Sequence, residues 1–420
     1  MTPLQEKILK RNAIRLLPIL TLAYLVNYLD RTNISFAALT MNKDIGLTAT
    51  QYGRGAGIFF LAYCAFEVPS NLALYRFGAR LWIARIMITW GLVSIGTVLV
   101  AGPWSFYIMR LLLGLAEAGF FAGVAYYLAA WFPSQYRARI LAGFLVAIPF
   151  STVVGAPLSG VLLQLDGTFG LAGWKWLLIV EGLPAVVLGF VVVALLADRP
   201  EAATWLDPQE KVELTQMLAA EPRERVRTGL LESFMDPRVI VCALVQFGFT
   251  VGSYGILFWL PQVLKTSGLS DLTVSLLTAI PYAFATAAMI WWALLVDASG
   301  KKISNLTVTC GLGAVGLVIS VLTGQLAIGL IGLTLALVGI TSARAVFWTI
   351  PTRFLTGVGA ASGLALINSI GVMGGYFGPE LMGSLKDATG GYLTGLLTMA
   401  GILAVSAVLA ASLRLLIKLE

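Results

Sequence analysis

The sequence predicts an all-α protein that crosses a membrane many times. Of its 420 residues, 58% are hydrophobic and only 12% are charged, and the mean hydropathy is +0.88. Soluble domains carry about 25% charged residues, so this composition is typical of a polytopic membrane protein. The apolar residues also gather in stretches long enough for membrane-spanning helices, which need about 20 residues each.

About twelve such stretches are present. Their approximate bounds are 15–38, 53–75, 82–101, 104–131, 140–164, 174–197, 238–264, 273–296, 304–324, 327–350, 356–384 and 392–416. One long polar segment separates the first six from the last six. We therefore predict an N-terminal six-helix half over residues 1–197, a linker over 198–237 and a C-terminal six-helix half over 238–420.

The linker is predicted to contain one amphipathic surface helix. The run Asp207-Pro208-Gln209-Glu210 is a helix-start pattern, with Asp as the N-cap, Pro at the first helical position and Glu near it. The apolar positions that follow are spaced for one face of a helix.

Lysine and arginine residues gather at the N-terminus, in alternate loops, in the linker and at the C-terminus. Cytoplasmic loops of membrane proteins carry this excess, so we expect both termini and the linker to be cytoplasmic. A net charge of +7 could suggest binding to nucleic acid, but the placement of the basic residues in loops on one side argues against it. The first span lacks a signal-peptidase pattern, so we expect a retained anchor.

The composition also argues against an enzyme. The chain has no histidine, and Cys64, Cys242 and Cys310 stand in separate apolar stretches, where we expect small buried side chains. Common zinc sites and Ser-His or Cys-His catalysis are therefore excluded. No phosphate-binding Gly-x-x-x-x-Gly-Lys motif is present, so ATP is not expected to drive the protein.

Two adjacent charges, Asp30 and Arg31, stand well inside the first span. A charge at the bilayer centre costs about 3 kcal/mol, so such residues usually face a pathway or a partner. Adjacent helix positions diverge by about 100°, which favours separate tasks for the two side chains over an ion pair within the helix. We expect Arg31 to grip a substrate carboxylate and Asp30 to carry a proton; the alternative is a structural pair buried against other helices.

The two halves repeat each other in sequence. Span 5 carries Gly155-Ala156-Pro157-Leu158-Ser159-Gly160, and span 11 carries Gly378-Pro379-Glu380-Leu381-Met382-Gly383. Two parallel halves related by an axis along the membrane normal are the plan of major facilitator transporters, whose substrate site lies between the halves at the midplane.

The chain resembles the major facilitator superfamily and, within it, the anion:cation symporter family of sugar-acid, tartrate and phthalate permeases. The motifs that carry this resemblance are Asn27-Tyr28-Leu29-Asp30-Arg31-Thr32-Asn33-Ile34-Ser35, Phe66-Glu67-Val68-Pro69-Ser70-Asn71, Phe258-Trp259-Leu260-Pro261, Phe347-Trp348-Thr349-Ile350-Pro351-Thr352 and the segment from Leu364 to Pro379. The chain departs from the superfamily at Tyr75, where an Asp usually stands before the glycine of the 2–3 loop. We therefore expect a different latch at that gate.

The resemblance implies roles for the buried charges. Arg31 would be the ligand of the substrate anion, and Asp30 a protonation site. Arg110 with Gly114 is similar to the arginine motif of the superfamily's fourth span, and the family pattern makes Glu117 the second proton-coupling carboxylate. A fixed Arg110–Glu117 or Arg110–Asp30 pair that holds the N-terminal half together is the structural alternative.

The C-terminal half is expected to supply shape and hydrogen bonds. The resemblance places Tyr28, Tyr63, Trp348 and Asn368 in the substrate site. Asn27 lies on the polar face of span 1, and the remaining candidates for hydroxyl binding and stacking are Gln246, Thr250, Tyr254 and Ser369. Packing is the alternative for each aromatic residue. Together with Arg31 these residues would form a small site for one anionic group with hydroxyls or a ring.

Four further intramembrane charges stay open. Glu67 can serve function or packing, whereas Glu181 and Glu380 lie nearer to span ends, where we expect structural, solvated side chains. Arg344 can provide a second positive point for a dicarboxylate, or pair with a carboxylate near the cytoplasmic gate; we favour the pair.

These observations predict a monomeric secondary transporter in the inner (plasma) membrane of a bacterium. It would import a small organic carboxylate, a hydroxy-dicarboxylate or sugar acid similar to tartrate or galactonate, by proton symport and alternating access. Protons would be the coupling ion, and no other cofactor is expected. An aromatic carboxylate symporter and a dicarboxylate exchanger are the alternatives.

Overall fold

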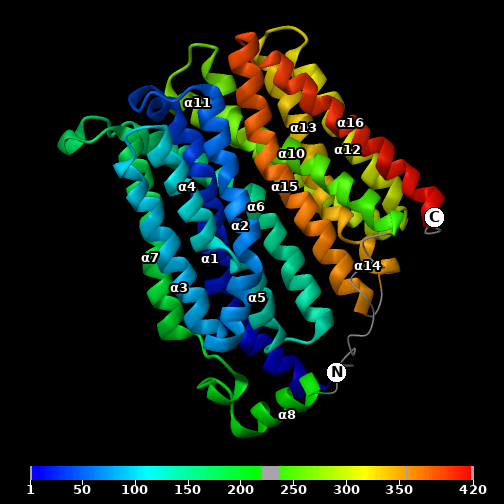
Figure 1. The fold of residues 1–420 in the computed structure, drawn as a ribbon. Coiled ribbons are helices and arrows are strands. Elements are labelled where there is room, and N and C mark those ends of the chain that lie inside the picture. The colour runs from blue at the N-terminus through cyan, green and yellow to red at the C-terminus, as the bar shows by residue number, and fades with distance from the viewer. Residues whose placement is uncertain (1, 220–235, 356–357, 418–420) are drawn as a thin grey trace.

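The computed structural model describes residues 2–219, 236–355 and 358–417, which form helices and connecting turns without a β-strand (Figure 1). The first half contains α1 (Pro3–Asp44), α2 (Ala49–Phe77), α3 (Ala79–Gly96), α4 (Pro103–Glu117), α5 (Phe120–Ala129), α6 (Ser134–Leu163) and α7 (Gly173–Leu195). After the linker helix α8 (Pro208–Ala219), the second half contains α10 (Pro237–Lys265), α11 (Asp271–Ser299), α12 (Lys302–Val321), α13 (Leu326–Phe347), α14 (Pro351–Phe354), α15 (Val358–Thr389) and α16 (Leu393–Leu416).

Eleven helical segments of the described chain are long and apolar enough to cross a membrane. They correspond to eleven of the predicted spans. The remaining predicted span, 356–384, is α15, apart from residues 356 and 357, which lie outside the described residues. α15 packs along α10 and α2 in the middle of the molecule.

The predicted span 104–131 is not one continuous helix. α4 ends at Glu117 and α5 begins at Phe120, with Gly119 between them in the left-handed region at φ 84°. A Cβ on Gly119 would lie 2.6 Å from the Ser70 hydroxyl of α2, so glycine meets both the backbone and the packing requirement. The break leaves Glu117 at the end of α4 in the protein interior.

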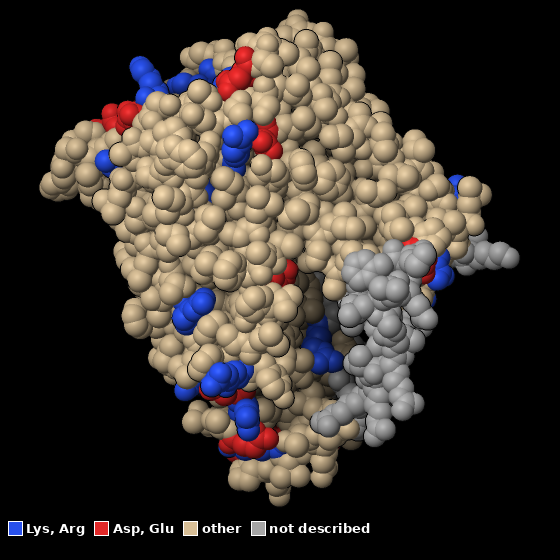
Figure 2. Space-filling model, viewed as in Figure 1, with Lys and Arg blue, Asp and Glu red and all other residues tan. Residues whose placement is uncertain are grey.

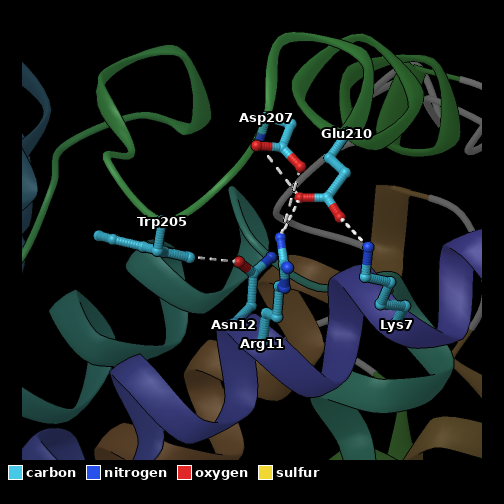
Figure 3. A network of polar contacts seen from close by, with 6 residues as sticks. All are labelled: Lys7, Arg11, Asn12, Trp205, Asp207 and Glu210. Carbon is cyan, nitrogen blue, oxygen red and sulfur yellow. Dashed lines mark hydrogen bonds and ion pairs between the residues drawn. The ribbon is translucent and has the colours of Figure 1, made fainter.

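The linker helix is attached to the first half. α8 begins at Pro208, as the Asp-Pro-Gln-Glu run predicts, and packs on the start of α1, which extends well before residue 15. Glu210 accepts from Arg11 at 2.7 Å and pairs with Lys7 at 3.1 Å (Figure 3). Residues 220–235 lie outside the described residues. This segment contains Arg223, Arg225 and Arg227, which contribute to the predicted excess of positive charge in the linker.

In the described part of the chain, the main contacts between the two halves are those of α2 along α15, α6 along α11, and α1 against α10 (Figure 1). Within the halves, α3 packs on α7, and α12 packs on α13 and α16. The interior between the halves is therefore bounded by helices from both, and the polar positions of α1 fall inside it.

At the end where α2 begins and α15 ends, the halves are in direct contact; we call this the closed end. Asp387 of α15 accepts from the backbone amides of Ala49 and Thr50, at 3.2 Å and 2.7 Å. Arg54 pairs with Glu380 at 3.3 Å. The contact therefore combines a charge at the start of α2 with an ion pair between the halves.

Small residues bring the two helix backbones together at the closed end. A Cβ on Gly57 would lie 2.7 Å from the carbonyl oxygen of Tyr376, and one on Gly53 would collide with the carbonyl oxygen of Pro379. Such contact is possible only without side chains, as in other close helix pairs of membrane proteins.

At the opposite end the halves separate, and Figure 2 shows a hollow between them; we call this the open end. Tyr75, at the end of α2, is 77% exposed there and lies against Tyr126. Asp198 instead holds the 2–3 loop, because it accepts from the Arg80 amide at 3.0 Å and pairs with the Arg80 guanidinium at 3.3 Å. A carboxylate from the end of the sixth span thus contacts the loop that lacks its usual Asp.

Candidate substrate site between the two halves

Arg31 lies in the interior at the middle of α1 and is 8% exposed. Its Nε donates to Oε1 of Glu117, and Asn27 Nδ2 donates to the same oxygen at 2.6 Å. Glu117 is almost completely buried, and its other oxygen, Oε2, has no hydrogen-bond partner among the described residues. The predicted substrate ligand is therefore paired with the predicted proton-coupling carboxylate.

Aromatic rings surround the Arg31 guanidinium. Its Cζ lies 5.0 Å from the ring centroids of Tyr28 and Tyr63 and 5.2 Å from that of Phe59. Faces of aromatic rings attract cations, so these rings hold the guanidinium in place while leaving its other N–H groups available. Tyr254 of α10 completes the group from the second half, because its hydroxyl approaches that of Tyr28.

Asp30 faces a different neighbourhood. It is 1% exposed and accepts from the Ser94 hydroxyl of α3 and from Asn33 Nδ2, the latter at 2.8 Å. Its Oδ2 has no hydrogen-bond partner among the described residues. The alternative of an Asp30–Arg31 pair is therefore wrong in this conformation, and the two charges lie on different sides of α1.

Arg110 is buried without a carboxylate within 4.0 Å in the described chain. Its Nη2 lies 3.5 Å from the carbonyl oxygen of Ala56, and its Cζ lies 5.1 Å from the Phe59 ring and 5.9 Å from the Phe258 ring. Neither of the fixed pairs considered above, Arg110–Glu117 or Arg110–Asp30, is present. Glu117, the last residue of α4, pairs with Arg31 of α1 instead.

The other candidates of the second half lie along its inner helices. Gln246 is 6% exposed, packs against Gly371 of α15 and leaves its Oε1 without a partner in the described chain. Trp348 and Asn368 are half-buried and Ser369 is exposed. We call Arg31 and the rings of Tyr28, Phe59 and Tyr63 the Arg31 group. Within the described residues, Tyr254 is the candidate from the second half that reaches this group.

The four further intramembrane charges differ in their surroundings. Glu181 is 1% exposed and accepts from Ser159 at 2.7 Å, which agrees with the expected structural role, although the side chain is buried and not solvated. Glu380 pairs with Arg54, in agreement with a structural role. Glu67 is half-buried. Arg344 donates to the Ser253 hydroxyl at 2.7 Å, and the described residues do not supply the carboxylate partner that we favoured.

Comparison with known families decides the identity of the fold. A family model described as Major Facilitator Superfamily matches residues 20–379. This chain belongs to the major facilitator superfamily.

Relatives and solved structures agree with this assignment. A "Putative tartrate transporter" of Agrobacterium vitis is 47% identical over 407 residues, which cover 96% of this chain and 94% of the relative. A "Quinolone resistance transporter" of Acinetobacter baumannii is 39% identical over 396 residues, which cover 93% of this chain and 91% of the relative. The crystal structure of a bacterial homologue of the human lysosomal transporter Spinster has the same fold, with a TM-score of 0.78, 15% identity and 98% and 97% of the two chains covered.

This major facilitator protein is therefore a multi-pass membrane transporter and not an enzyme, as its composition predicts. The relatives named for organic acids are consistent with the organic-anion branch that the motifs indicate.

Sequence reasoning missed two residues of the site. Phe59 lies beneath both Arg31 and Arg110, and Ser94 donates to Asp30. Phe59 stands one helical turn before Tyr63, so helical spacing on α2 was a usable signal. Ser94 is one of several hydroxyl residues in its span, and its contact with Asp30 depends on how α3 lies relative to α1.

Proposed function

We propose that this transporter imports a small organic carboxylate together with protons, by alternating access. The observation that carries the proposal is the buried contact between Arg31 and Glu117 in the interior between the two halves. A guanidinium suited to bind a carboxylate is occupied here by a carboxylate of the protein that can be protonated.

Protonation of Glu117 would release Arg31 for the substrate. An ionised Glu117 competes with the substrate for the same guanidinium, whereas a protonated carboxyl binds it weakly because charge-assisted hydrogen bonds are about twice as strong as neutral ones. Binding of substrate and binding of a proton at Glu117 therefore favour each other.

Asp30 is proposed as a second proton site. It is buried, and its Oδ2 has no partner among the described residues. The hydrogen bond from Ser94 connects α1 with α3, and the one from Asn33 stays within α1, so neither reaches the substrate group. Its protonation would therefore act on helix packing in the first half, while protonation of Glu117 acts on the substrate ligand.

We assign the open end to the cytoplasm and the conformation to the inward-facing state. The basic N-terminal stretch of α1 and the linker helix α8 lie at the open end in Figure 1, and positive loops are characteristic of the cytoplasmic side. The location would be a bacterial inner membrane, and the functional unit a monomer.

The substrate is proposed to be a hydroxylated acid similar to tartrate. The tyrosine hydroxyls beside Arg31 suit hydroxyl groups of the substrate, and the name of the 47%-identical relative points to the same class. The aromatic walls also suit an aromatic carboxylate, which is the second candidate. Exchange of two dicarboxylates without protons is the third.

Two experiments test the proposal. Thermal-shift screening of the purified protein against small carboxylates at pH 5.5 and 7.5 should give a hydroxy or aromatic acid that raises the melting temperature, because a ligand of the native state stabilises it. Uptake into proteoliposomes should then require an imposed proton gradient, whereas counterflow should not. Equal accumulation with and without the gradient would favour the exchanger, and no response to any carboxylate would contradict the substrate class.

A further inference from the structure

Arg344 is a cation of the second half that faces the same interior as Arg31. Its position near the end of α13 is half-buried, and its Nη2 donates to the Ser253 hydroxyl of α10 at 2.7 Å. Its Cζ lies 6.0 Å from the ring centroid of Tyr254, the residue next to Ser253. The guanidinium is thus directed to the inner face of α10, where the second half meets the Arg31 group.

Arg31 and Arg344 stand on two sides of one tyrosine pair. Tyr28 approaches Arg31 through its ring, Tyr254 approaches Arg344 through its ring, and the two hydroxyls approach each other. Both tyrosines lie within the electrostatic reach of both arginines. Two cations, one from each half, therefore flank a pair of hydroxyl groups.

No carboxylate of the described residues lies within salt-bridge distance of Arg344. The two nearby carboxylates belong to the surroundings of Arg31 and not of Arg344. Glu117 is paired with Arg31, and the cation whose charge acts on Glu67 is also Arg31. Water at the open end can solvate Arg344 in this conformation. When the halves close around a substrate, that water is lost, and a carboxylate of the substrate would offset the cost of burying the Arg344 guanidinium.

We propose that Arg344 binds the second carboxylate of a short dicarboxylate substrate whose first carboxylate binds Arg31. The inference rests on the proposed function, in which Arg31 is the anion ligand, and narrows its substrate class to hydroxy-dicarboxylates. Hydroxyl groups between the two carboxylates would meet the hydroxyls of Tyr28 and Tyr254, which can both donate and accept.

Placement in opposite halves gives this pair of arginines a further consequence. A dicarboxylate that spans Arg31 and Arg344 ties α1 of the first half to α13 of the second, so it stabilises the state in which the halves close. A monocarboxylate contacts one half only and leaves the other guanidinium unpaired. Discrimination between the two classes would therefore reside in Arg344 and not in Arg31.

The test uses a matched ligand pair, tartrate and its monoamide, in which one carboxylate is replaced by an uncharged group of nearly the same shape. Affinities for the purified full-length protein are measured by titration calorimetry at one pH and ionic strength. Wild-type protein should bind tartrate about 10- to 100-fold more tightly than the monoamide, the range expected for charge-assisted hydrogen bonds.

The variant Arg344→Gln should lose this discrimination. Its affinity for tartrate should fall to about that for the monoamide, while its affinity for the monoamide stays at the wild-type value, which also shows that the variant is folded. Arg344→Lys keeps the charge without the planar fork and should retain part of the ratio. Arg353→Gln, which removes an exposed arginine from α14, is the matched control and should keep the full ratio.

Two results would overturn the inference: equal affinity of the wild-type protein for both ligands, or an unchanged ratio in Arg344→Gln. If Arg344→Gln binds neither ligand, the ratio of tartrate to monoamide affinity in Arg344→Lys decides the question. A ratio equal to that of the wild type in Arg344→Lys would contradict recognition of the carboxylate by the planar guanidinium of Arg344. Failure of the proposed function is separate from these results. It would appear as no binding of either ligand to the wild-type protein, or as undiminished binding of both in Arg31→Gln.

Discussion

Arg31 of α1 and Glu117 of α4 form a buried ion pair in the interior between the two halves, and Asn27 donates to the same carboxylate oxygen. The proposed substrate ligand is therefore held by a group whose charge depends on pH. The pair joins two helices of one half, so its rupture can change substrate affinity without separating the halves.

Replacement of Glu117 by Gln should separate binding from proton coupling. The amide cannot ionise, so Arg31 is permanently available, and binding and counterflow should persist with little dependence on pH between 5.5 and 7.5. Accumulation driven by a proton gradient should be lost in proteoliposomes. Gradient-driven accumulation at the wild-type level in this variant would show that Glu117 does not couple the proton.

Replacement of Arg31 by Lys should weaken substrate binding by about 10-fold or more, because an ammonium cannot reproduce the two-pronged contact with a carboxylate. The loss should appear in the thermal shift with substrate, while the unliganded protein keeps a similar melting temperature. Affinity equal to that of the wild type would remove Arg31 from the site.

Replacement of Asp30 by Asn should preserve substrate affinity and lose proton-driven accumulation. Asp30 has no contact with the Arg31 group, and an amide can keep a hydrogen bond with Ser94. Ser94→Ala is the companion variant, because it removes the hydrogen bond but not the titrating group. Loss of substrate binding in Asp30→Asn would place Asp30 in the substrate site instead.

Replacement of Gly57 by Val should disfavour the closed end of the molecule. The added side chain meets the Tyr376 backbone, and overpacking of about 1–3 kcal/mol shifts a two-state equilibrium about 5- to 150-fold. Cys64 on α2 is half-buried and lies against Ser369 of α15, whereas Cys242 and Cys310 are buried. The rate of maleimide labelling at Cys64 therefore reports opening between the halves.

We expect slower Cys64 labelling from the cytoplasmic side in Gly57→Val. The control is Gly391→Val, near the same end, where an added Cβ would meet nothing within 4 Å. Equal labelling rates in the two variants would argue against a gate formed by α2 and α15.

Replacement of Glu210 by Gln should loosen α8 from α1 and increase tryptic cleavage after Lys211. Hydrogen bonds to charged groups contribute about 1.5–3 kcal/mol, and Glu210 makes such contacts with Lys7 and Arg11. The exposed Glu201→Gln is the control. Cleavage rates equal to those of the control would contradict a clamp between the linker and the first half.

The same contact should be insensitive to pH near neutrality. Burial acts to raise the pKa of Glu210, but the Asp207 amide and the nearby Lys7 and Arg11 outweigh it and hold the pKa below its ordinary value. The contact is therefore present above the ordinary range near about 4.3 and is lost only as the pH falls through the lowered pKa. Cleavage normalised to a peptide substrate should be constant from pH 8 to 6, and a rise over that interval would contradict the assignment.

The sequence by itself determined the class of fold, most helix positions and the identity of the residues that carry charge into the membrane. Apolar stretches must form helices in a bilayer, and a charge placed inside one is costly enough to be noticed, so Asp30, Arg31, Arg110 and Glu117 were all visible in the sequence. Periodicity along one helix also placed Tyr28 and Arg31 on one face.

Only the tertiary structure decided which charges meet. Whether Glu117 pairs with Arg110 on its own helix or with Arg31 on α1 depends on the break at Gly119 and on the packing of α4, which no local pattern records. The burial of Glu181 and the missing carboxylate beside Arg344 likewise depend on neighbours far away in the chain. Spacing along one helix fixes the direction of a side chain, but partners belong to helices whose mutual distance is set by contacts across the whole protein.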